Sequence, residues 1–192
     1  MKMLGISGSM TSYGRTGKTR AAIEFVMNAA KSKFPDLELE MLDLRDFKIA
    51  ILDGRALADY KDDTPKVVAM VENADCFVIG TPMYRGTYTG ALKNLIDHAP
   101  FKAFMGKVVG FVATGATSHH YLSIDHEMRA LMAWFNAYMA PGSGYLENSH
   151  WKGDDIVDER VKTHLSQLGE NIVRMAQQLK GVEALPPPLV GW

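Results

Sequence analysis

The chain has 192 residues, 47% of them hydrophobic, which is enough for one domain with a substantial buried core. Its 21 basic and 22 acidic residues give a formal net charge of −1, which argues against a protein that wraps nucleic acid or lies on an anionic membrane. No apolar run approaches the roughly 20 residues of a membrane-spanning helix.

Strands and helices are expected to alternate along the first part of the chain. Residues 2–7 predict a strand, which a loop rich in Gly, Ser and Thr and a helix over about residues 17–32 follow. Residues 37–42 alternate apolar and charged side chains, as a strand near the edge of a sheet does. Residues 43–64 show no clear period and are expected to form a long connection. Pro65 can begin the next helix, which is expected to end near Asn73.

The alternation continues in the second part. Residues 76–79 form an apolar run typical of a strand buried on both faces, and we expect Gly80 to end it. Thr89 can cap a helix that begins at Gly90. Further strands are expected at residues 108–113 and 137–140, and further helices at residues 119–135 and 155–179. This order predicts an α/β fold with a parallel sheet and right-handed crossovers, as a single domain over residues 1–192.

The single cysteine, Cys76, excludes an internal disulfide and a cysteine metal cluster. Its place in the apolar run favours a buried, inert thiol over a reactive one. The apolar part of the N-terminus is too short for a signal peptide, so the cytoplasm is the expected compartment. No spacing of histidines and carboxylates matches a metal-binding motif, and we predict no metal site.

The loop before the first helix resembles two kinds of phosphate-binding loop. Gly17, Lys18 and Thr19 follow a strand and open a helix, as the end of a Walker A motif does. That motif needs glycine where this chain has Ser12. It also needs a later strand ending in an acidic magnesium ligand, and the run that ends at Gly80 offers none. A P-loop nucleotidase is therefore the weaker interpretation.

The stronger interpretation is a phosphate site made by backbone N–H groups at the start of the helix. The hydroxyls of Ser9 and Thr16 can donate hydrogen bonds there, and Arg15 can form a fork to two phosphate oxygens. Lys18 can add positive charge, or it can simply be a solvated lysine of the first turn.

Two further loops follow buried strands. Residues 82–88 hold two tyrosines, an arginine and a glycine, so they offer backbone donors and a flat aromatic surface. Residues 114–118 contain Gly115, whose backbone can approach the edge of a ligand. Open α/β sheets bind ligands at the carboxyl ends of their strands, and a planar, conjugated ligand such as a flavin suits these loops.

Residues 80–97 closely resemble the second FMN-binding loop of the flavodoxin-like NAD(P)H-dependent FMN reductases. In that family a strand ends in Gly-Thr-Pro-x-Tyr and is followed by Gly and by Gly-x-Leu-Lys-Asn-x-x-Asp, which this chain matches with few departures. The loops after residues 7 and 113 resemble the family's first and third flavin loops. Gly14 departs from the family, because relatives often carry serine there. The resemblance covers about residues 2–140, and the residues beyond Pro141 are generic.

The resemblance implies a flavodoxin-like, doubly wound, five-stranded parallel sheet with helices on both faces. It also implies FMN and NADPH or NADH as cofactors, and dimers that often pair into tetramers. The cofactor-binding residues that it implies are Ser9, Arg15, Thr16, Gly17, Lys18, Thr81, Pro82, Met83, Tyr84, Arg85, Gly86, Thr114, Gly115, Ala116 and Thr117.

Residues 113–132 are most similar to the sulfonate-utilisation branch of the family, whose members supply reduced FMN to a separate monooxygenase. In that branch a helix residue next to an Ile-Asp pair is often a tyrosine, inserted as a π-bulge at the subunit interface. The matching residue here is His126, after Ile124 and Asp125. We therefore expect His126 to be an interface or regulatory residue, with a solvent-facing histidine as the alternative.

The chemistry that the resemblance implies is hydride transfer from a nicotinamide to a flavin, which needs positioned rings and no acid–base dyad. We predict no catalytic side chain of that kind. Arg85 is the best candidate partner for a nicotinamide ribose phosphate or for a carboxylate of a second subunit, unless it is simply solvated. Two other functions stay open: an enzyme that keeps FMN tightly and reduces quinones, azo dyes or a metal oxyanion, and a flavodoxin-type electron carrier. Flavodoxins tend to be strongly acidic, which this chain is not.

Overall fold

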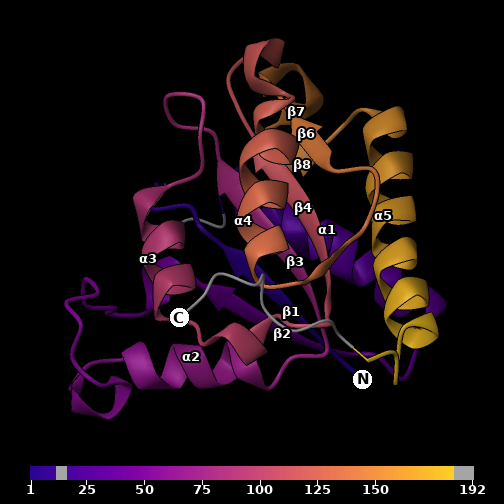
Figure 1. The fold of residues 1–192 in the computed structure, drawn as a ribbon. Coiled ribbons are helices and arrows are strands. Elements are labelled where there is room, and N and C mark those ends of the chain that lie inside the picture. The colour runs from indigo at the N-terminus through magenta and orange to yellow at the C-terminus, as the bar shows by residue number, and fades with distance from the viewer. Residues whose placement is uncertain (12–16, 184–192) are drawn as a thin grey trace.

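The computed structural model describes residues 1–11 and 17–183 (Figure 1). The strands are β1 (Lys2–Ser7), β2 (Glu38–Asp43), β3 (Cys76–Pro82), β4 (Val108–Thr114), β5 (Tyr138–Met139), β6 (Gly144–Leu146), β7 (Trp151–Lys152) and β8 (Asp155–Ile156). The α-helices are α1 (Lys18–Lys33), α2 (Thr64–Glu72), α3 (Gly90–His98), α4 (Arg129–Trp134) and α5 (Glu159–Gln178). A π-helix, Ile124–Met128, precedes α4, and short 3-10 helices lie at Leu44–Asp46, Leu57–Asp59, Phe101–Ala103, Ser118–His120 and Asn148–His150.

The main sheet is parallel, with the order β2-β1-β3-β4-β5, which confirms the predicted doubly wound, five-stranded arrangement. β3 pairs with β4 along its whole length, so β5 and β6 both lie on the other side of β4. β5 pairs with the first residues of β4 and β6 with the last. The fifth position of the sheet is thus shared by two short strands, and the sequence predicted only the first of them.

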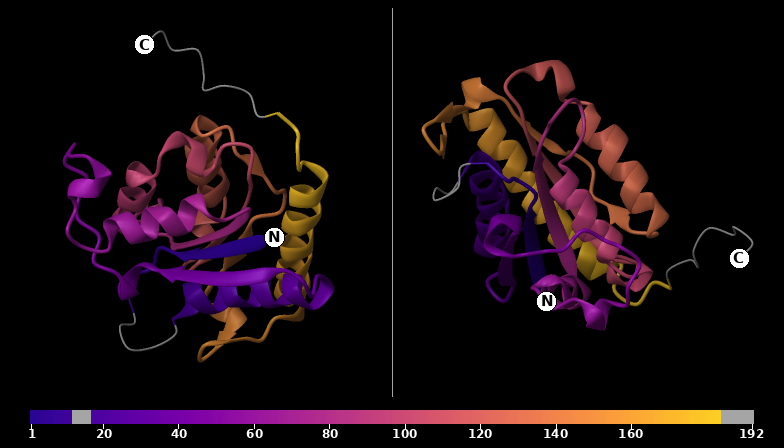
Figure 2. Two further views of the ribbon diagram at one scale, coloured as in Figure 1. Left: turned by 90° about the horizontal axis from the view of Figure 1, so that it is seen from below. Right: turned by 90° about the vertical axis from the view of Figure 1, so that its left-hand side faces the viewer.

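Helices cover both faces of the sheet, as Figure 2 shows with the sheet between the two layers. α1 and α5 pack on one face with the buried side chains of Met3, Val78 and Val108. α2, α3 and the π-helix with α4 pack on the other face, with Leu4, Phe77 and Phe111 among the buried side chains. Buried apolar area on both faces is the main force that holds such a sheet together.

Gly80 does not end its strand, contrary to the prediction, because β3 continues to Pro82. A Cβ atom at Gly80 would lie 2.5 Å from the Cδ1 atom of Ile23 on α1. The glycine is therefore explained by the close approach of α1 to the sheet. The longer strand carries Thr81 and Pro82 to the edge of the sheet, where the predicted site lies.

Two predicted helices differ from the structure. The expected helix over residues 119–135 is divided into a 3-10 turn, a π-helix and α4. The final helix begins at Glu159 rather than at residue 155, because Asp155–Ile156 pairs with Trp151–Lys152 in a small hairpin. Asp158 then caps α5, and its side chain accepts hydrogen bonds from the backbone N–H groups of Arg160 and Val161.

Candidate flavin site at the carboxyl edge of the sheet

The carboxyl ends of β1, β3, β4 and β6 are joined by backbone hydrogen bonds that continue beyond the regular ladders. Gly8 N–H donates to the carbonyl oxygen of Gly80 at 2.8 Å. Met83 N–H donates to Thr114 at 2.8 Å, and Gly115 N–H donates to Leu146 at 3.0 Å. The three loops that the sequence singled out therefore begin side by side on one rim.

Thr89 ties the first loop to the second. Its hydroxyl donates to the carbonyl oxygen of Gly8 at 2.6 Å and accepts from Leu92 N–H at 3.2 Å, which confirms the predicted cap of α3. The hydroxyl of Thr81 is also used inside the protein, because it donates to Pro82 and accepts from Thr89 N–H. Buried Thr81 thus stabilises the two ends of the second loop from inside the protein.

In the first loop, the buried hydroxyl of Ser9 lies 3.1 Å from the hydroxyl of Thr11. Arg15 and Thr16 lie outside the described residues. Gly17 occupies the N-cap of α1 with φ 76°, so it adds no capping side chain, and the first turn holds no acidic residue. The N-terminal amides of α1 and the positive end of its dipole thus have no carboxylate of that turn beside them, an arrangement that favours a bound anion.

Lys18 makes two side-chain contacts with the segment after β6. Its Nζ donates to Oδ1 of Asn148 at 2.9 Å and lies 5.8 Å from the ring centroid of Trp151. The next residue, Thr19, is buried and shares a 2.8 Å hydrogen bond with the hydroxyl of Thr114. The start of α1 is thereby joined both to the end of β4 and to the segment after β6.

The second loop is a tight hairpin. Tyr84 and Thr87 exchange backbone hydrogen bonds of 2.9 and 3.2 Å around Arg85 and Gly86. Both central residues have positive φ, 56° and 84°, as in a type I′ turn. Met83 is buried, whereas the Tyr84 ring is 42% exposed. The hairpin therefore projects an aromatic side chain and an arginine from the rim.

In the third loop, Gly115 is covered by Tyr145. A Cβ atom at Gly115 would lie 2.0 Å from the tyrosine oxygen, which donates to the carbonyl oxygen of Thr117 at 2.7 Å. Because the N–H of Gly115 is bonded to Leu146, that group is not available to a ligand. Ala116 and Thr117 are exposed at the rim instead.

Sequence reasoning missed Tyr145 and Asn148. Both follow the break in the fifth sheet position, in the segment that we took as generic. The available signal was Gly144-Tyr145-Leu146 itself, an alternation of small, aromatic and apolar residues typical of a short strand. That signal is too short to be separated from a loop by sequence alone.

His126 lies within the π-helix Ile124–Met128, so the predicted π geometry at this residue is confirmed. Its side chain is 85% exposed, and Nδ1 lies 3.1 Å from Oε1 of Glu127. Glu127 in turn accepts a 3.4 Å hydrogen bond from the hydroxyl of Thr87 in the second loop. A role for His126 at an interface stays a prediction.

Cys76 is fully buried, and burial, with a further contribution from the charge of Asp75, raises the pKa of its thiol to about 12. This confirms the predicted burial of Cys76, and a buried thiol with a raised pKa is expected to be inert. Within residues 1–11 and 17–183, no cluster of histidine, cysteine and carboxylate side chains is arranged to hold a metal ion. In the same part of the chain, no helix has the length and apolar character needed to cross a membrane.

The fold is flavodoxin-like, and the three loops begin together at the carboxyl edge of its sheet. A solved flavodoxin from the domain Archaea aligns with it at a TM-score of 0.59 and 14% identity, covering 94% of this chain and 99% of that one.

Residues 1–152 match the model of the family described as NADPH-dependent FMN reductase, and the chain belongs to this family. It is 41% identical to an NAD(P)H-dependent FAD/FMN reductase of Geobacillus thermodenitrificans, over 96% of this chain and 99% of the relative. It is 31% identical to the NADH-dependent FMN reductase SfnF of Pseudomonas putida, over 73% and 74% of the two chains. The protein is accordingly an oxidoreductase that uses NAD(P)H and FMN.

Proposed function

We propose that the three rim loops bind FMN, with its phosphate at the first loop and its isoalloxazine between the second and third. The observation that carries this proposal is the set of backbone hydrogen bonds that brings Gly8, Met83 and Gly115 to one edge. A flavin has its phosphate and its ring at opposite ends, and the rim offers a different chemistry at each end.

The start of α1 fits the phosphate. The N-terminal amides of α1 carry the positive end of its dipole, and the side chains that carry charge at this turn, Lys18 and Arg20, are basic. Arg15 and Thr16 complete this part of the proposed site, with Ser9 supplying a hydroxyl.

The second and third loops fit the ring. Tyr84 offers an aromatic face, and a Cβ atom at Gly86 would lie in ordinary contact with His120, at 3.8 Å from its Nδ1 atom. Exposed Ala116 and Thr117 offer backbone groups to the polar edge of the ring. The side chains of Pro82, Met83 and Thr114 are buried, so these residues support the two loops from inside the protein.

FMN accepts a hydride from the nicotinamide when it is bound, and the isoalloxazine itself supplies that reactivity. The protein's part is to hold the two rings in contact and to keep water away from them. Arg85, which projects from the hairpin, is our candidate for contact with the nicotinamide nucleotide. The proposal needs no side chain that transfers a proton.

We further propose that the protein releases reduced FMN to a flavin-dependent monooxygenase, as members of the sulfonate-utilisation branch do. The π-helix at His126 supports this placement within the family. A homodimer or homotetramer in the cytoplasm, built from one domain per chain, completes the proposal. Exposed Trp134 and Tyr121 on the π-helix side are suited to a subunit contact, and we place His126 at that interface.

A single assay separates this function from its competitors. NADPH and NADH oxidation is followed with purified protein, with and without added FMN and with a quinone. Oxidation that saturates with free FMN supports the proposal. Quinone-dependent turnover with flavin that stays bound would instead identify a tight-binding quinone or azo reductase, and no oxidation of either nucleotide would identify an electron carrier.

A further inference from the structure

The fifth position of the sheet is interrupted between β5 and β6, and extra residues are inserted there. Met139 of β5 pairs with Val109, and Gly144 of β6 pairs with Val112. From the first pair to the second, β4 advances by three residues while the fifth position advances by five. Residues 140–143 therefore form a bulge, and its carbonyl groups need partners outside the regular ladder.

Side chains from helices on both faces of the sheet supply these partners. Arg129 of α4 donates from Nη2 to the carbonyl oxygen of Ala140 at 3.0 Å. From the other face, Nε2 of His164 on α5 lies 2.9 Å from the carbonyl oxygen of Gly142 and 3.2 Å from that of Ser143. The bulge is thus held from α4 and from α5.

Arg129 is itself fixed by the π-helix. Its Nε donates to Oδ1 of Asp125 at 2.6 Å. The hydroxyl of Ser143 donates to the same oxygen at 2.5 Å and lies 3.3 Å from Nη2 of Arg129. A partly exposed ion pair between helix residues four apart, as this one is, contributes little stability by itself. The informative contacts are therefore those to Ala140 and Ser143, which join the π-helix and α4 to the bulge.

The bulge leads directly into the residue that covers the third loop. A Cβ atom at Gly144 would lie 2.5 Å from Cδ2 of Leu165 on α5, so the next residue, Tyr145, projects to the opposite face. There its hydroxyl donates to Thr117 and lies over Gly115. Because β6 has only three residues, few ladder bonds hold it, and the position of Tyr145 depends on the bulge before it.

We propose that Arg129 is a positioning residue for flavin binding: by holding the bulge, it keeps Tyr145 over Gly115 and so fixes the backbone groups that the third loop presents to the flavin ring. Nε and Nη2 of Arg129 both donate within the protein, so the residue acts through Tyr145. This inference rests on the proposed function. It adds that affinity for the flavin ring depends on the contact between α4 and the bulge.

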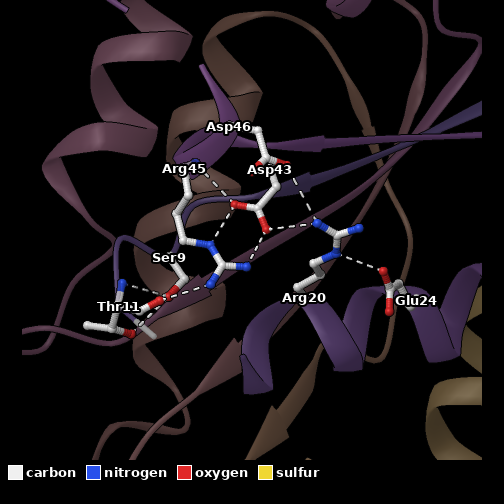
Figure 3. A network of polar contacts seen from close by, with 7 residues as sticks. All are labelled: Ser9, Thr11, Arg20, Glu24, Asp43, Arg45 and Asp46. Carbon is white, nitrogen blue, oxygen red and sulfur yellow. Dashed lines mark hydrogen bonds and ion pairs between the residues drawn. The ribbon is translucent and has the colours of Figure 1, made fainter. Parts of the chain in front are cut away.

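Arg20 offers a matched control at the opposite edge of the sheet (Figure 3). It donates from Nε to Oε1 of Glu24, four residues on, at 2.8 Å, and its Nη1 lies 3.5 Å from Oδ2 of Asp43 at the end of β2. Its side chain is 31% exposed, close to the 28% of Arg129. These partners are carboxylates, whereas Arg129 also bonds a backbone carbonyl group of the bulge.

The first test needs no flavin. The N–H of Gly115 donates to the carbonyl oxygen of Leu146 at 3.0 Å, so it reports whether β6 is in place. Amide hydrogen exchange is followed by NMR and compared with that of Val78, in the centre of the sheet. In Arg129→Met we expect the exchange rate of Gly115 relative to Val78 to rise by about tenfold, and in Arg20→Met to change less than about twofold.

The second test measures dissociation constants for FMN and riboflavin by quenching of flavin fluorescence. Arg129→Met is expected to weaken both by about tenfold, because the two ligands share the ring that the third loop contacts. Tyr145→Phe, which removes the bond to Thr117, is expected to weaken both as well. The variant with both changes should bind within about twofold of the weaker single variant, because the two residues act on one loop. The effects of Arg20→Met and Tyr145→Phe should instead multiply.

Arg129→Lys is the second variant at this position. Its ammonium group keeps a positive charge beside Asp125 but lacks the fork that reaches Ala140 at the same time. We expect the same faster exchange at Gly115 and the same loss of affinity for both flavins, including where Arg129→Met does not fold.

Unchanged exchange at Gly115 in both Arg129 variants would overturn the inference. Losses of affinity that multiply with Tyr145→Phe, as those of Arg20→Met are expected to do, would overturn it too. Neither result would remove the proposed flavin site. Wild-type protein that binds neither FMN nor riboflavin would instead overturn the proposed function, and the role of Arg129 in flavin binding with it.

Discussion

The hydroxyl of Tyr145 donates a 2.7 Å hydrogen bond to the carbonyl oxygen of Thr117 and lies over Gly115. The third loop is thus shaped by a tyrosine on β6, a strand for which the family motifs give no sign. Since the proposed contacts of this loop with the flavin come from its backbone, the tyrosine determines which groups reach the rim.

Gly115→Ala tests this relationship. The added Cβ would overlap the Tyr145 oxygen, so the ring must move and release Thr117. We expect FMN affinity to fall by about tenfold, measured by fluorescence quenching, because one ordered edge of the site is lost. Gly90→Ala is the control, since nothing lies within 4 Å of a Cβ at that position. FMN affinity unchanged in Gly115→Ala would show that the third loop does not contact the flavin.

Arg85→Gly separates charge from backbone shape. Arg85 has φ 56°, a region that glycine adopts freely, so the type I′ turn is retained while the guanidinium is removed. If Arg85 contacts a 2′-phosphate, KM for NADPH rises by about tenfold while KM for NADH changes less than about twofold. Steady-state kinetics with both nucleotides measures the difference. An equal change in the two KM values would show that Arg85 does not contact the 2′-phosphate.

Thr89→Val removes two hydrogen bonds from one hydroxyl. The variant loses the cap of α3 and leaves the Gly8 carbonyl oxygen without its 2.6 Å partner. We expect the free energy of unfolding, measured by urea denaturation, to fall by about 2 kcal/mol. Thr89→Ser keeps the hydroxyl and is expected to retain most of the stability. A loss in Thr89→Ser with none in Thr89→Val would assign the stabilisation to the methyl group instead.

Cys76 is expected to be unreactive in the folded protein. With a thiol pKa near 12, the thiolate that attacks a disulfide reagent is scarce at pH 8, and burial also blocks access. A chromogenic disulfide reagent should therefore react only after denaturation, and then with one thiol per chain. Rapid reaction of the native protein at pH 8 would show that β3 opens in solution.

Asp158 is expected to make the stability of α5 depend on pH. Its backbone hydrogen bonds, first from Val161 and then from Arg160, together with the charge of Arg160, hold the pKa of the carboxyl below its ordinary value of 3.8. A lowered folded-state pKa means that the stabilisation is present above pH 3.8 and is lost as the pH falls through the lower, folded value.

The wild-type protein and Asp158→Asn, which keeps a capping oxygen without the charge, are compared by denaturant unfolding between pH 7 and pH 3. The wild-type advantage is expected to shrink below pH 4 and to be constant above pH 5. An advantage that did not change with pH would mean that the carboxylate charge contributes nothing to the cap.

The sequence by itself determined the order of the five main strands and of α1, α2, α3 and α5, the edge position of β2, the cap at Thr89 and the family. Each depends on neighbouring residues: the period of apolar side chains, a hydroxyl before a helix, or the continuous motif over residues 80–97. The rim was predictable too, because the carboxyl ends of parallel strands meet at one edge of a sheet.

Only the tertiary structure decided that Gly80 and Gly115 are glycines because Ile23 and Tyr145 need their space. It alone showed the bond from Lys18 to Asn148, whose partners are separated by 130 residues, and the bond from Arg45 to Thr11, separated by 34. Such contacts leave no periodic pattern in one sequence, because they depend on how distant segments are brought together by the packing of α1, α5 and the sheet.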